Sequence, residues 1–381
     1  MILHNSKLTN IGNTIFTVIG KLANEHKAVN LSQGFPNFGT DPMLLQLVGE
    51  AMNNGLNQYA PMQGIYSLRE IIAEKIESLY GKAYHPEYEI TITAGATQAI
   101  FTAIAAFVKP DDEVVVLKPA YDCYEPAIEL AGGKVVPLQL SGKNFKVNWD
   151  DFKSKLTDKT KMVIINTPHN PSGTIFSKSD MLQLSDTLKD TNSILLSDEV
   201  YEHIVFDNHS HESVAKYPDL TNRSLLCASF GKTFHVTGWK LGYIAGPKDL
   251  MEEFQKVHQY NVFCVNHPMQ KGIANYLKNE DTYLGLSDFY QKKRDYFLKA
   301  IATSRFQFTP AAGTYFQVVD YSKITEESDV EFSKLLITEH KIASIPLSVF
   351  NLNNADHNQL RFCFAKTEET LDKAAEIINR I

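Results

Sequence analysis

The chain reads SFGKTFHVTGWKLGY at residues 229–243, where Lys232 and Lys240 lie eight residues apart among small, turn-forming and hydroxyl side chains. No acidic residue occurs between Ser229 and Pro247, although an exposed helix usually mixes its lysines with glutamates. A buried lysine has a lowered pKa and can attack an aldehyde, while a second fixed cation suits a phosphate. An aldehyde and a phosphate together describe pyridoxal phosphate. Either lysine alone would be explained by an ordinary loop beside a buried strand, so the hypothesis depends on the pair.

The composition indicates a globular protein with a small-molecule partner. A chain of 381 residues exceeds one typical core, so we expect two domains or one large α/β unit. The net charge of −7 offers no basic surface for nucleic acid. No apolar run approaches the roughly 20 residues that cross a bilayer, and residues 1–7 lack a signal-peptide pattern. The cysteines lack metal-binding spacing, so we expect no metal, reduced thiols and a cytoplasmic location; they are Cys123, Cys227, Cys264 and Cys363.

Strand and helix patterns alternate from about residue 42 to residue 286. The strand candidates are apolar and rich in β-branched residues, at 89–93, 113–117, 134–137, 162–166, 194–197, 224–228 and 242–246. Helix candidates separate several of them, at 97–108, 125–130 and 178–189. This alternation predicts right-handed crossovers and a mostly parallel sheet with both faces covered. In such sheets, ligands bind at the carboxyl ends of the strands.

The last part of the chain has a different pattern, which indicates a smaller α+β domain. Helix candidates at 287–303, 329–340 and 367–381 alternate there with strand candidates at 314–319 and 359–364. The first forty residues have loop-like sequence, such as Ser32-Gln33-Gly34-Phe35-Pro36, and we expect them to pack on this domain. We therefore assign residues 43–286 to a large cofactor-binding domain, and residues 1–42 with 287–381 to a small domain and N-terminal segment.

Two predicted strands end in groups that suit a phosphorylated pyridine aldehyde. Asp198 and Tyr201 follow strand 194–197; the carboxylate can keep the pyridine nitrogen protonated, and the tyrosine can reach the phenolate oxygen of the ring. Strand 162–166 ends in the loop NTPHNPSG, which two prolines stiffen and whose asparagines are neutral donors. An acidic helix start and a plain Asn-Pro turn remain the alternative interpretations.

Two further strand ends are weaker signals. Gly95-Ala96-Thr97 opens a helix, whose free backbone N–H groups can bind a phosphate, although a simple helix cap explains the threonine equally well. Tyr121 follows strand 113–117 and can lay its ring on a flat cofactor, although an aromatic at such a place is usually part of the core.

Nine stretches of the chain form a pattern of order and spacing: LSQGFPNF at 31–38, NQYAPMQG at 57–64, TAGATQA at 93–99, PAYDCYEP at 119–126, NTPHNPSG at 166–173, SDEVYE at 197–202, SFGKTFHVTGWKLGY at 229–243, KVHQY at 256–260 and RFCFAK at 361–366. This pattern resembles the class I aminotransferases, which are fold-type I pyridoxal phosphate enzymes, and it is most similar to their methionine and kynurenine/glutamine aminotransferase branch. The resemblance implies an α/β fold, in which helices sandwich a mostly parallel seven-stranded sheet beside a smaller α+β domain.

The resemblance also implies roles for the residues around the cofactor ring. Lys232 would hold the cofactor covalently and shuttle the α-proton of the substrate, while Asp198 would pair with the ring nitrogen. Asn170 and Tyr201 would bind the phenolate oxygen, and Tyr121 would stack on the ring.

A phosphate site and a carboxylate site are implied in the same way. The residues that would bind the phosphate are Ala96, Thr97, Ser229, Lys240 and, from the neighbouring subunit of a homodimer, Tyr59. Many family members carry arginine where this chain has Lys240, but its branch commonly uses lysine. Arg361 would clamp the substrate's α-carboxylate together with Asn170 and the backbone at Gly34, as a bidentate guanidinium can.

The side-chain pocket would be apolar, and its candidate walls are Ile15, Phe16, Tyr121 and Phe263. A dicarboxylate substrate needs a second cation, yet the other arginines lie outside the motifs that read a side chain: Arg69, Arg223, Arg294, Arg305 and Arg380. We therefore expect an aminotransferase that moves the α-amino group of methionine or an aromatic amino acid to a 2-oxo acid by a ping-pong mechanism. Glutamine remains possible, because a neutral polar side chain needs only hydrogen bonds.

Four rival functions are weighed against this one. A cysteine-conjugate β-lyase or a kynurenine/glutamine aminotransferase would use the same site, and the sequence does not separate them. A cofactor-binding regulator would carry an added basic DNA-binding segment, for which the chain has no spare hundred residues. An inactive homologue would normally lack one of Lys232, Asp198 and Arg361, and all three are present.

Overall fold

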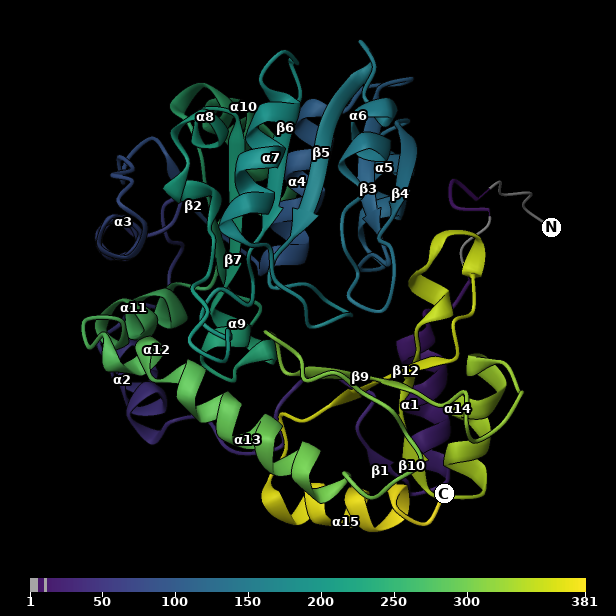
Figure 1. The fold of residues 1–381 in the computed structure, drawn as a ribbon. Helices are drawn as coiled ribbons and strands as arrows, with labels where there is room; N and C mark the ends of the chain where they lie inside the picture. Colours follow the sequence, from purple (N-terminus) through teal and green to yellow (C-terminus); the bar gives the residue numbers. More distant parts are fainter. Residues whose placement is uncertain (1–5, 10–11) are drawn as a thin grey trace, which may run out of the picture.

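The centre of the computed structural model is a seven-stranded sheet with the strand order β2-β8-β7-β6-β5-β3-β4 (Figure 1). The strands are β2 (Ile90–Thr93), β3 (Glu113–Lys118), β4 (Lys134–Gln139), β5 (Thr160–Asn166), β6 (Ile194–Asp198), β7 (Ser224–Ser229) and β8 (Gly242–Ala245). β8 is antiparallel to both of its neighbours, and the other pairs are parallel. The predicted mostly parallel sheet is therefore confirmed, and each of the seven strand candidates overlaps an observed strand.

The structure describes residues 6–9 and 12–381. The sequence expectation about a signal peptide concerned residues 1–7, of which residues 1–5 lie outside the described residues. Within the described ranges, the structure contains no helix that combines the length and the apolar character needed to span a membrane. The same residues contain no group of three or more His, Cys, Asp or Glu side chains arranged to hold a metal ion.

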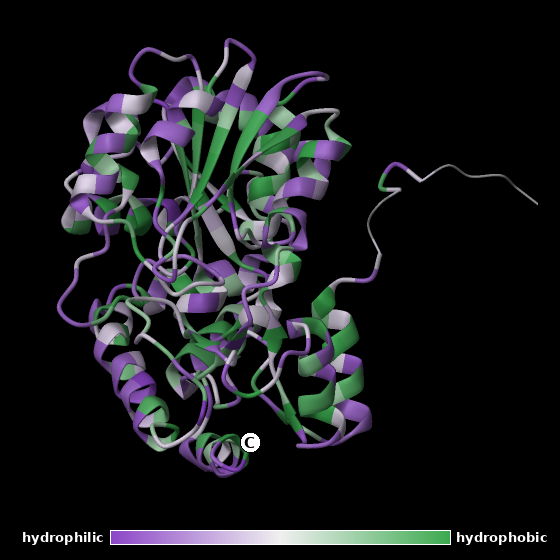
Figure 2. Ribbon diagram, turned by 45° about the vertical axis from the view of Figure 1, so that its right-hand side comes forward, coloured by the Kyte–Doolittle hydropathy of each residue, from purple (hydrophilic) through white to green (hydrophobic). Residues whose placement is uncertain are grey.

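Both faces of the seven-stranded sheet are buried, because successive side chains along each strand point to opposite sides. Val114 and Val116 of β3 belong to one apolar core with residues of α4 (Ala96–Phe107) and α10 (Lys248–Asn261). Val115 and Leu117 belong to the other core, which contains residues of α7 (Lys178–Leu188). Figure 2 shows the strands in apolar colour between helices whose outer faces are polar. This arrangement leaves the carboxyl edge of the sheet as the place for polar chemistry.

A second group of elements lies beyond that edge, in the lower half of Figure 1. A three-stranded antiparallel sheet has the order β11-β12-β9, from β9 (Phe316–Asp320), β11 (Ile345–Pro346) and β12 (Gln359–Cys363). β1 (Val29–Asn30) pairs in parallel with β10 (Ile342–Ala343). The helices around them are α1 (Ile15–Glu25), α13 (Leu286–Ala300), α14 (Asp329–Thr338) and α15 (Glu368–Ile378). The division of the chain into residues 43–286 and residues 1–42 with 287–381 stays a prediction.

The expectation of loop-like structure in the first forty residues is wrong for residues 15–25, which form α1. Thr14 caps this helix by accepting a hydrogen bond from the backbone N–H of Thr17. Ile19 and Ala23, four residues apart, are buried in a core that includes Ile337 of α14. The local sequence carries the pattern of this helix, a threonine cap followed by apolar residues at helical spacing, and packing of that apolar face against α14 stabilises it.

The remaining helices connect and cover these layers. They are α2 (Pro42–Asn53), α3 (Tyr66–Tyr80), α5 (Tyr124–Leu130), α6 (Trp149–Lys155), α8 (Pro218–Thr221), α9 (Phe230–Thr233), α11 (His267–Tyr276) and α12 (Asp281–Leu284), with 3-10 turns at Val214–Lys216, Thr237–Trp239, Ser348–Phe350 and Leu352–Asn354. α9 is the turn that carries Lys232 directly after β7, so the end of a central strand places this lysine at the sheet edge.

Candidate active site

The strand ends of the large sheet enclose a cavity of about 130 Å³. Nine of the residues that the sequence predicted as site residues line it: Ala96, Thr97, Tyr121, Asn170, Asp198, Tyr201, Ser229, Lys232 and Lys240. Eight of them lie at the carboxyl ends of five strands, β2, β3, β5, β6 and β7, or in the segments that follow, and Lys240 lies just before β8; this is the edge of a mostly parallel sheet where a ligand is expected. A larger hollow of about 760 Å³ lies between residues 143–147 and 307–312 and contains none of the predicted site residues.

Asp198 is a buried carboxylate at the end of β6, with 4% of its surface exposed. The Tyr124 hydroxyl donates to its Oδ2 at 2.5 Å, and the Val200 backbone N–H donates to its Oδ1 at 3.3 Å. Burial raises the pKa of Asp198 to about 6, against the opposing effect of the Tyr124 hydrogen bond. A cation placed beside this carboxylate would stabilise its ionised form and lower that pKa.

Lys232 lies on the opposite side of the same cavity. Its Nζ donates to the carbonyl oxygen of Gly34 at 3.2 Å and lies 5.8 Å from the ring centroids of both Tyr201 and Tyr315. Burial lowers the pKa of Lys232 to about 8, because the charged ammonium loses its water. A lysine with this pKa carries a substantial neutral fraction near physiological pH, which is the form that attacks an aldehyde.

The amino end of α4 forms the part of the cavity where small residues meet a cation. Gly95 precedes the helix with a φ of +78°, and no side chain caps the helix start by a hydrogen bond. A Cβ atom added to Gly95 would lie 3.6 Å from Nζ of Lys240, so the lysine head is close to this backbone. Free N–H groups at a helix start together with an ammonium form an anion site.

These groups fit pyridoxal phosphate on the chemistry of the donors alone. The buried carboxylate of Asp198 suits a protonated ring nitrogen, and the amine of Lys232 suits the aldehyde. The helix start at Gly95 with Lys240 suits the phosphate.

Arg361 is almost fully buried, with 1% of its surface exposed, at the border of this cavity. Its Nη1 donates to Oδ1 of Asn170 at 2.6 Å, and its Nη2 donates to the Ser32 carbonyl oxygen at 3.1 Å. Within residues 6–9 and 12–381, no hydrogen-bond partner reaches its Nε. The guanidinium carbon lies 3.9 Å from the Phe316 ring centroid and 5.4 Å from that of Phe16, so its flat faces are apolar.

Two predicted site residues do not reach the cavity from within this chain. Tyr59 is 80% exposed and Phe263 is 44% exposed, and their rings pack edge to face at 5.1 Å. Phe16 lies beside Arg361, as described above, and Gly34 contacts Lys232 through its carbonyl oxygen. The structure therefore brings Phe16 and Gly34 to the site and leaves Tyr59 and Phe263 on the surface.

Sequence reasoning missed several residues that shape the site. Tyr124, which holds Asp198, lies three residues after Tyr121 in the PAYDCYEP stretch, a spacing that could have indicated a second inward tyrosine. The hydroxyl of Tyr315 donates to the Gly34 carbonyl oxygen at 2.7 Å. The two residues are 281 positions apart in the sequence, and no sequence pattern predicted this contact. Glu199 lies within the predicted SDEVYE stretch, but its buried hydrogen bonds behind the site were not foreseen.

Comparisons with known proteins agree with this geometry. The profile of the family "Aminotransferase class I and II" matches residues 26–378. The methionine aminotransferase of Escherichia coli K12 is 45% identical over 100% of this chain and 99% of its own length. Human kynurenine–oxoglutarate transaminase 1 is 32% identical over 94% of both chains. A crystal structure of an Escherichia coli protein identified as a methionine aminotransferase superposes with a TM-score of 0.98 at 45% identity, covering 100% of both chains.

Proposed function

Because the chain belongs to the class I and II aminotransferases, which use pyridoxal phosphate, we propose that it transfers the α-amino group of methionine and of aromatic amino acids to a 2-oxo acid in a ping-pong reaction. The bound cofactor supplies an electron-withdrawing ring and an aldehyde that accepts the amino group. The residues that would hold it are the nine that line the cavity.

Each of the central side chains has one task in this proposal. Asp198 holds the ring nitrogen in its protonated form, and Tyr124 keeps the carboxylate in place. The neutral amine of Lys232 would take the proton from the substrate's Cα, and the resulting ammonium would return it to the former aldehyde carbon of the cofactor, which the amino nitrogen separates from Cα. Burial, which lowers the pKa of Lys232 to about 8, raises the neutral fraction of this amine to about one tenth at pH 7 and one half at pH 8.

The observation that carries the proposal is the buried Arg361, whose Nε has no partner. An unsatisfied buried donor is costly, and a substrate carboxylate would satisfy it with a charge-assisted hydrogen bond. Asn170 and Ser32 orient the guanidinium through its two other nitrogens. Fixing the α-carboxylate in this way aligns the Cα–H bond for Lys232.

An apolar substrate side chain is supported by the surroundings of Arg361. The rings of Phe16, Phe316 and Phe350 lie within 6.0 Å of its guanidinium carbon. Three other arginines already have partners: Arg69 and Arg223 donate to backbone carbonyl oxygens, and Arg294 binds Asp207. The last two, Arg305 and Arg380, are exposed, so none of these five is available for a second substrate carboxylate. The methionine aminotransferase at 45% identity supports the same choice.

We also propose a homodimer that works in the cytoplasm. The exposed rings of Tyr59, Tyr260 and Phe263 would lie against a second subunit, where Tyr59 would reach the phosphate. The four cysteines are unpaired, in keeping with a reducing compartment.

The test is the absorbance of the purified holoenzyme mixed with single amino acids and no acceptor. We expect methionine and phenylalanine to convert the cofactor from its aldehyde to its amine form, and aspartate to leave it unchanged. If the protein binds no cofactor, the proposal is wrong.

A cysteine-conjugate β-lyase remains the second candidate because it would use the same residues; release of pyruvate and ammonia from a cysteine conjugate, without conversion of the cofactor by methionine, would favour it. Conversion by kynurenine or glutamine in preference to methionine would identify the other alternative.

A further inference from the structure

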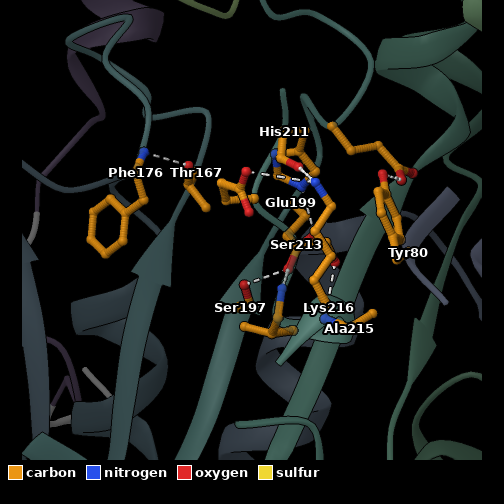
Figure 3. A network of polar contacts seen from close by, with 12 residues as sticks. Tyr80, Thr167, Phe176, Ser197, Glu199, His211, Ser213, Ala215 and Lys216 are labelled. Atoms are coloured by element: carbon orange, nitrogen blue, oxygen red, sulfur yellow. Dashed lines mark hydrogen bonds and ion pairs between the residues drawn. The ribbon is translucent and has the colours of Figure 1, made fainter. Parts of the chain in front are cut away.

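A second buried carboxylate lies directly beside Asp198, on the side away from the cofactor cavity. Glu199 is completely buried, and its Oε1 accepts hydrogen bonds from the Ser197 hydroxyl at 2.8 Å and from the Val214 backbone N–H at 3.0 Å. Its Oε2 lies 2.7 Å from Nε2 of His211 (Figure 3). A carboxylate only accepts, so the Nε2 of His211 carries the proton in this contact. None of these partners lines the cavity.

The loop that supplies His211 and Val214 is itself held in place. The Lys216 ammonium donates to the His211 carbonyl oxygen at 2.5 Å, and the Ser213 hydroxyl accepts from the Ala215 backbone N–H at 3.2 Å (Figure 3). Glu199 therefore joins the end of β6 to a segment with fixed geometry.

The hydrogen bonds of Glu199 fix the backbone on both sides of Asp198. Ser197 and Glu199 are bonded to each other through their side chains, and Asp198 is the residue between them. On its other sides, the Asp198 carbonyl oxygen accepts from the Asn166 amide at 2.8 Å, and the Glu199 backbone N–H donates to the Cys227 carbonyl oxygen at 2.8 Å. The direction of the Asp198 carboxylate therefore depends on the backbone of residues 197–199, which the hydrogen bond between the Ser197 and Glu199 side chains holds in one conformation.

We propose that Glu199 is a positioning residue for the amino-transfer reaction, acting through its hydrogen bonds with Ser197, His211 and Val214 to aim Asp198 at the ring nitrogen. The inference rests on the role proposed above for Asp198. Catalytic groups need placement within a fraction of an ångström, and a shift of about 1 Å can lower the rate about a hundredfold. Asp198 makes only two side-chain hydrogen bonds of its own, so its backbone must supply the rest of its orientation.

The test compares Glu199→Leu with Glu199→Gln in the holoenzyme. Leucine fills a similar volume and accepts no hydrogen bond, whereas glutamine retains an acceptor for Ser197 and Val214. We expect Glu199→Leu to lower kcat at least about tenfold and to shift the absorbance of the bound cofactor, with KM for methionine within about twofold. Glu199→Gln should recover most of kcat and the original absorbance.

A matched control separates positioning from stability. Asp329 is 1% exposed and accepts hydrogen bonds from the backbone N–H and hydroxyl of Ser348, and neither of these two residues lines the cavity. We expect Asp329→Leu to lower Tm without shifting the cofactor absorbance. An equal loss of kcat in Asp329→Leu, or the kcat and absorbance of the parent protein in Glu199→Leu, would overturn the inference.

Two further variants keep the test decisive. If Glu199→Leu does not fold, His211→Leu removes one of the three hydrogen bonds; a decrease in kcat of about threefold with shifted cofactor absorbance supports the inference, and unchanged values overturn it. Asp198→Asn, measured in parallel, identifies which idea fails. If Asp198→Asn has the turnover and cofactor absorbance of the parent protein, both the proposed role of Asp198 and the inference about Glu199 are wrong. If Asp198→Asn loses turnover while Glu199→Leu behaves like the parent protein, only the inference about Glu199 is wrong.

Discussion

The candidate active site has two walls, which are held in different ways. One wall is the edge of the seven-stranded sheet, where Asp198 and Lys232 directly follow parallel strands whose backbone hydrogen bonds fix their positions. The other wall is the segment of residues 32–35, which lies outside the lining of the cofactor cavity, contacts Lys232 through the Gly34 carbonyl oxygen and belongs to no helix or strand. Its four consecutive carbonyl oxygens instead accept hydrogen bonds from side chains, namely those of Arg361, Lys366, Lys232 and Tyr315.

This difference predicts where mutations act on catalysis and where they act on binding. A strand end keeps its place when a single side chain is lost, because the ladder of backbone hydrogen bonds remains. Residues 32–35 depend on a few side-chain donors, so losing one donor changes the wall itself. Gly34 also belongs to the proposed carboxylate site. We therefore expect variants of the sheet edge, Lys232 included, to change kcat, and variants of the other donors to residues 32–35 to change KM.

Lys232→Ala has the largest expected effect, because it removes the only group proposed to move the substrate's α-proton. General acid–base catalysis alone contributes about 10² to 10⁴-fold, so we expect turnover to fall by about a thousandfold or more. Steady-state assays with methionine and a 2-oxo acid measure this loss, and circular dichroism checks that the fold is kept. Turnover within tenfold of the parent enzyme would contradict the proposed mechanism.

Arg361→Lys tests the boundary between the two walls, since Arg361 binds both Asn170 and the Ser32 carbonyl oxygen. A lysine cannot make the planar fork, and a charged hydrogen bond contributes about 1.5–3 kcal/mol. We expect KM for methionine to rise roughly tenfold to a hundredfold. Arg294 is equally buried and binds Asp207 elsewhere, so Arg294→Lys is the control and should leave KM unchanged. Equal effects of the two variants would refute the carboxylate role of Arg361.

The sheet-edge wall could be predicted from the sequence because its strands and the polar residues that follow them are recognisable within a few consecutive positions. The run EVVVL at 113–117 is apolar and β-branched, and its polar neighbours follow at the strand end. Asp198 was identified because it follows such a run at 194–197, and Lys232 was identified because it forms a pair with Lys240 within the stretch 229–243. Parallel strands then bring these ends together without further information.

The family resemblance assigned Gly34 to the carboxylate site, but the side-chain hydrogen bonds that hold residues 32–35 could not be predicted, because these contacts join distant parts of the chain. Lys232 and Gly34 are 198 residues apart, and Lys366 and Gln33 are 333 residues apart. Hydrogen bonds to carbonyl oxygens need no particular residue at the acceptor, so they leave no pattern at positions 33 and 35. Glu199 lies within the SDEVYE stretch, but its role as a buried acceptor was not predicted, because its partners His211 and Val214 lie outside that stretch.

The pH dependence of cofactor binding tests whether Lys232 is as desolvated as the structure shows. Burial lowers the pKa of Lys232 to about 8 in the protein without cofactor, and only the neutral amine attacks the aldehyde. The rate of reconstitution by added pyridoxal phosphate should therefore rise about tenfold from pH 7 to pH 9 and level off above it. Stopped-flow absorbance on the apoprotein measures this rate. A rate that keeps rising through pH 10 would show an ordinary lysine and a more hydrated cavity.

Lys366→Met is the smallest of these changes and the sharpest test of the comparison. The Lys366 ammonium donates to the carbonyl oxygens of Gln33 and Phe35 at 3.3 and 2.7 Å, and Lys366 is 3% exposed. The variant loses both hydrogen bonds, but neither of them touches the substrate, so we expect only about 1 kcal/mol of the loss to reach substrate binding, which corresponds to roughly a fivefold increase in KM for methionine with kcat nearly unchanged. Lys366→Arg retains a donor and should restore most of the affinity. If Lys366→Met instead lowers kcat at constant KM, residues 32–35 orient Lys232 through Gly34, and the two walls act as one catalytic unit.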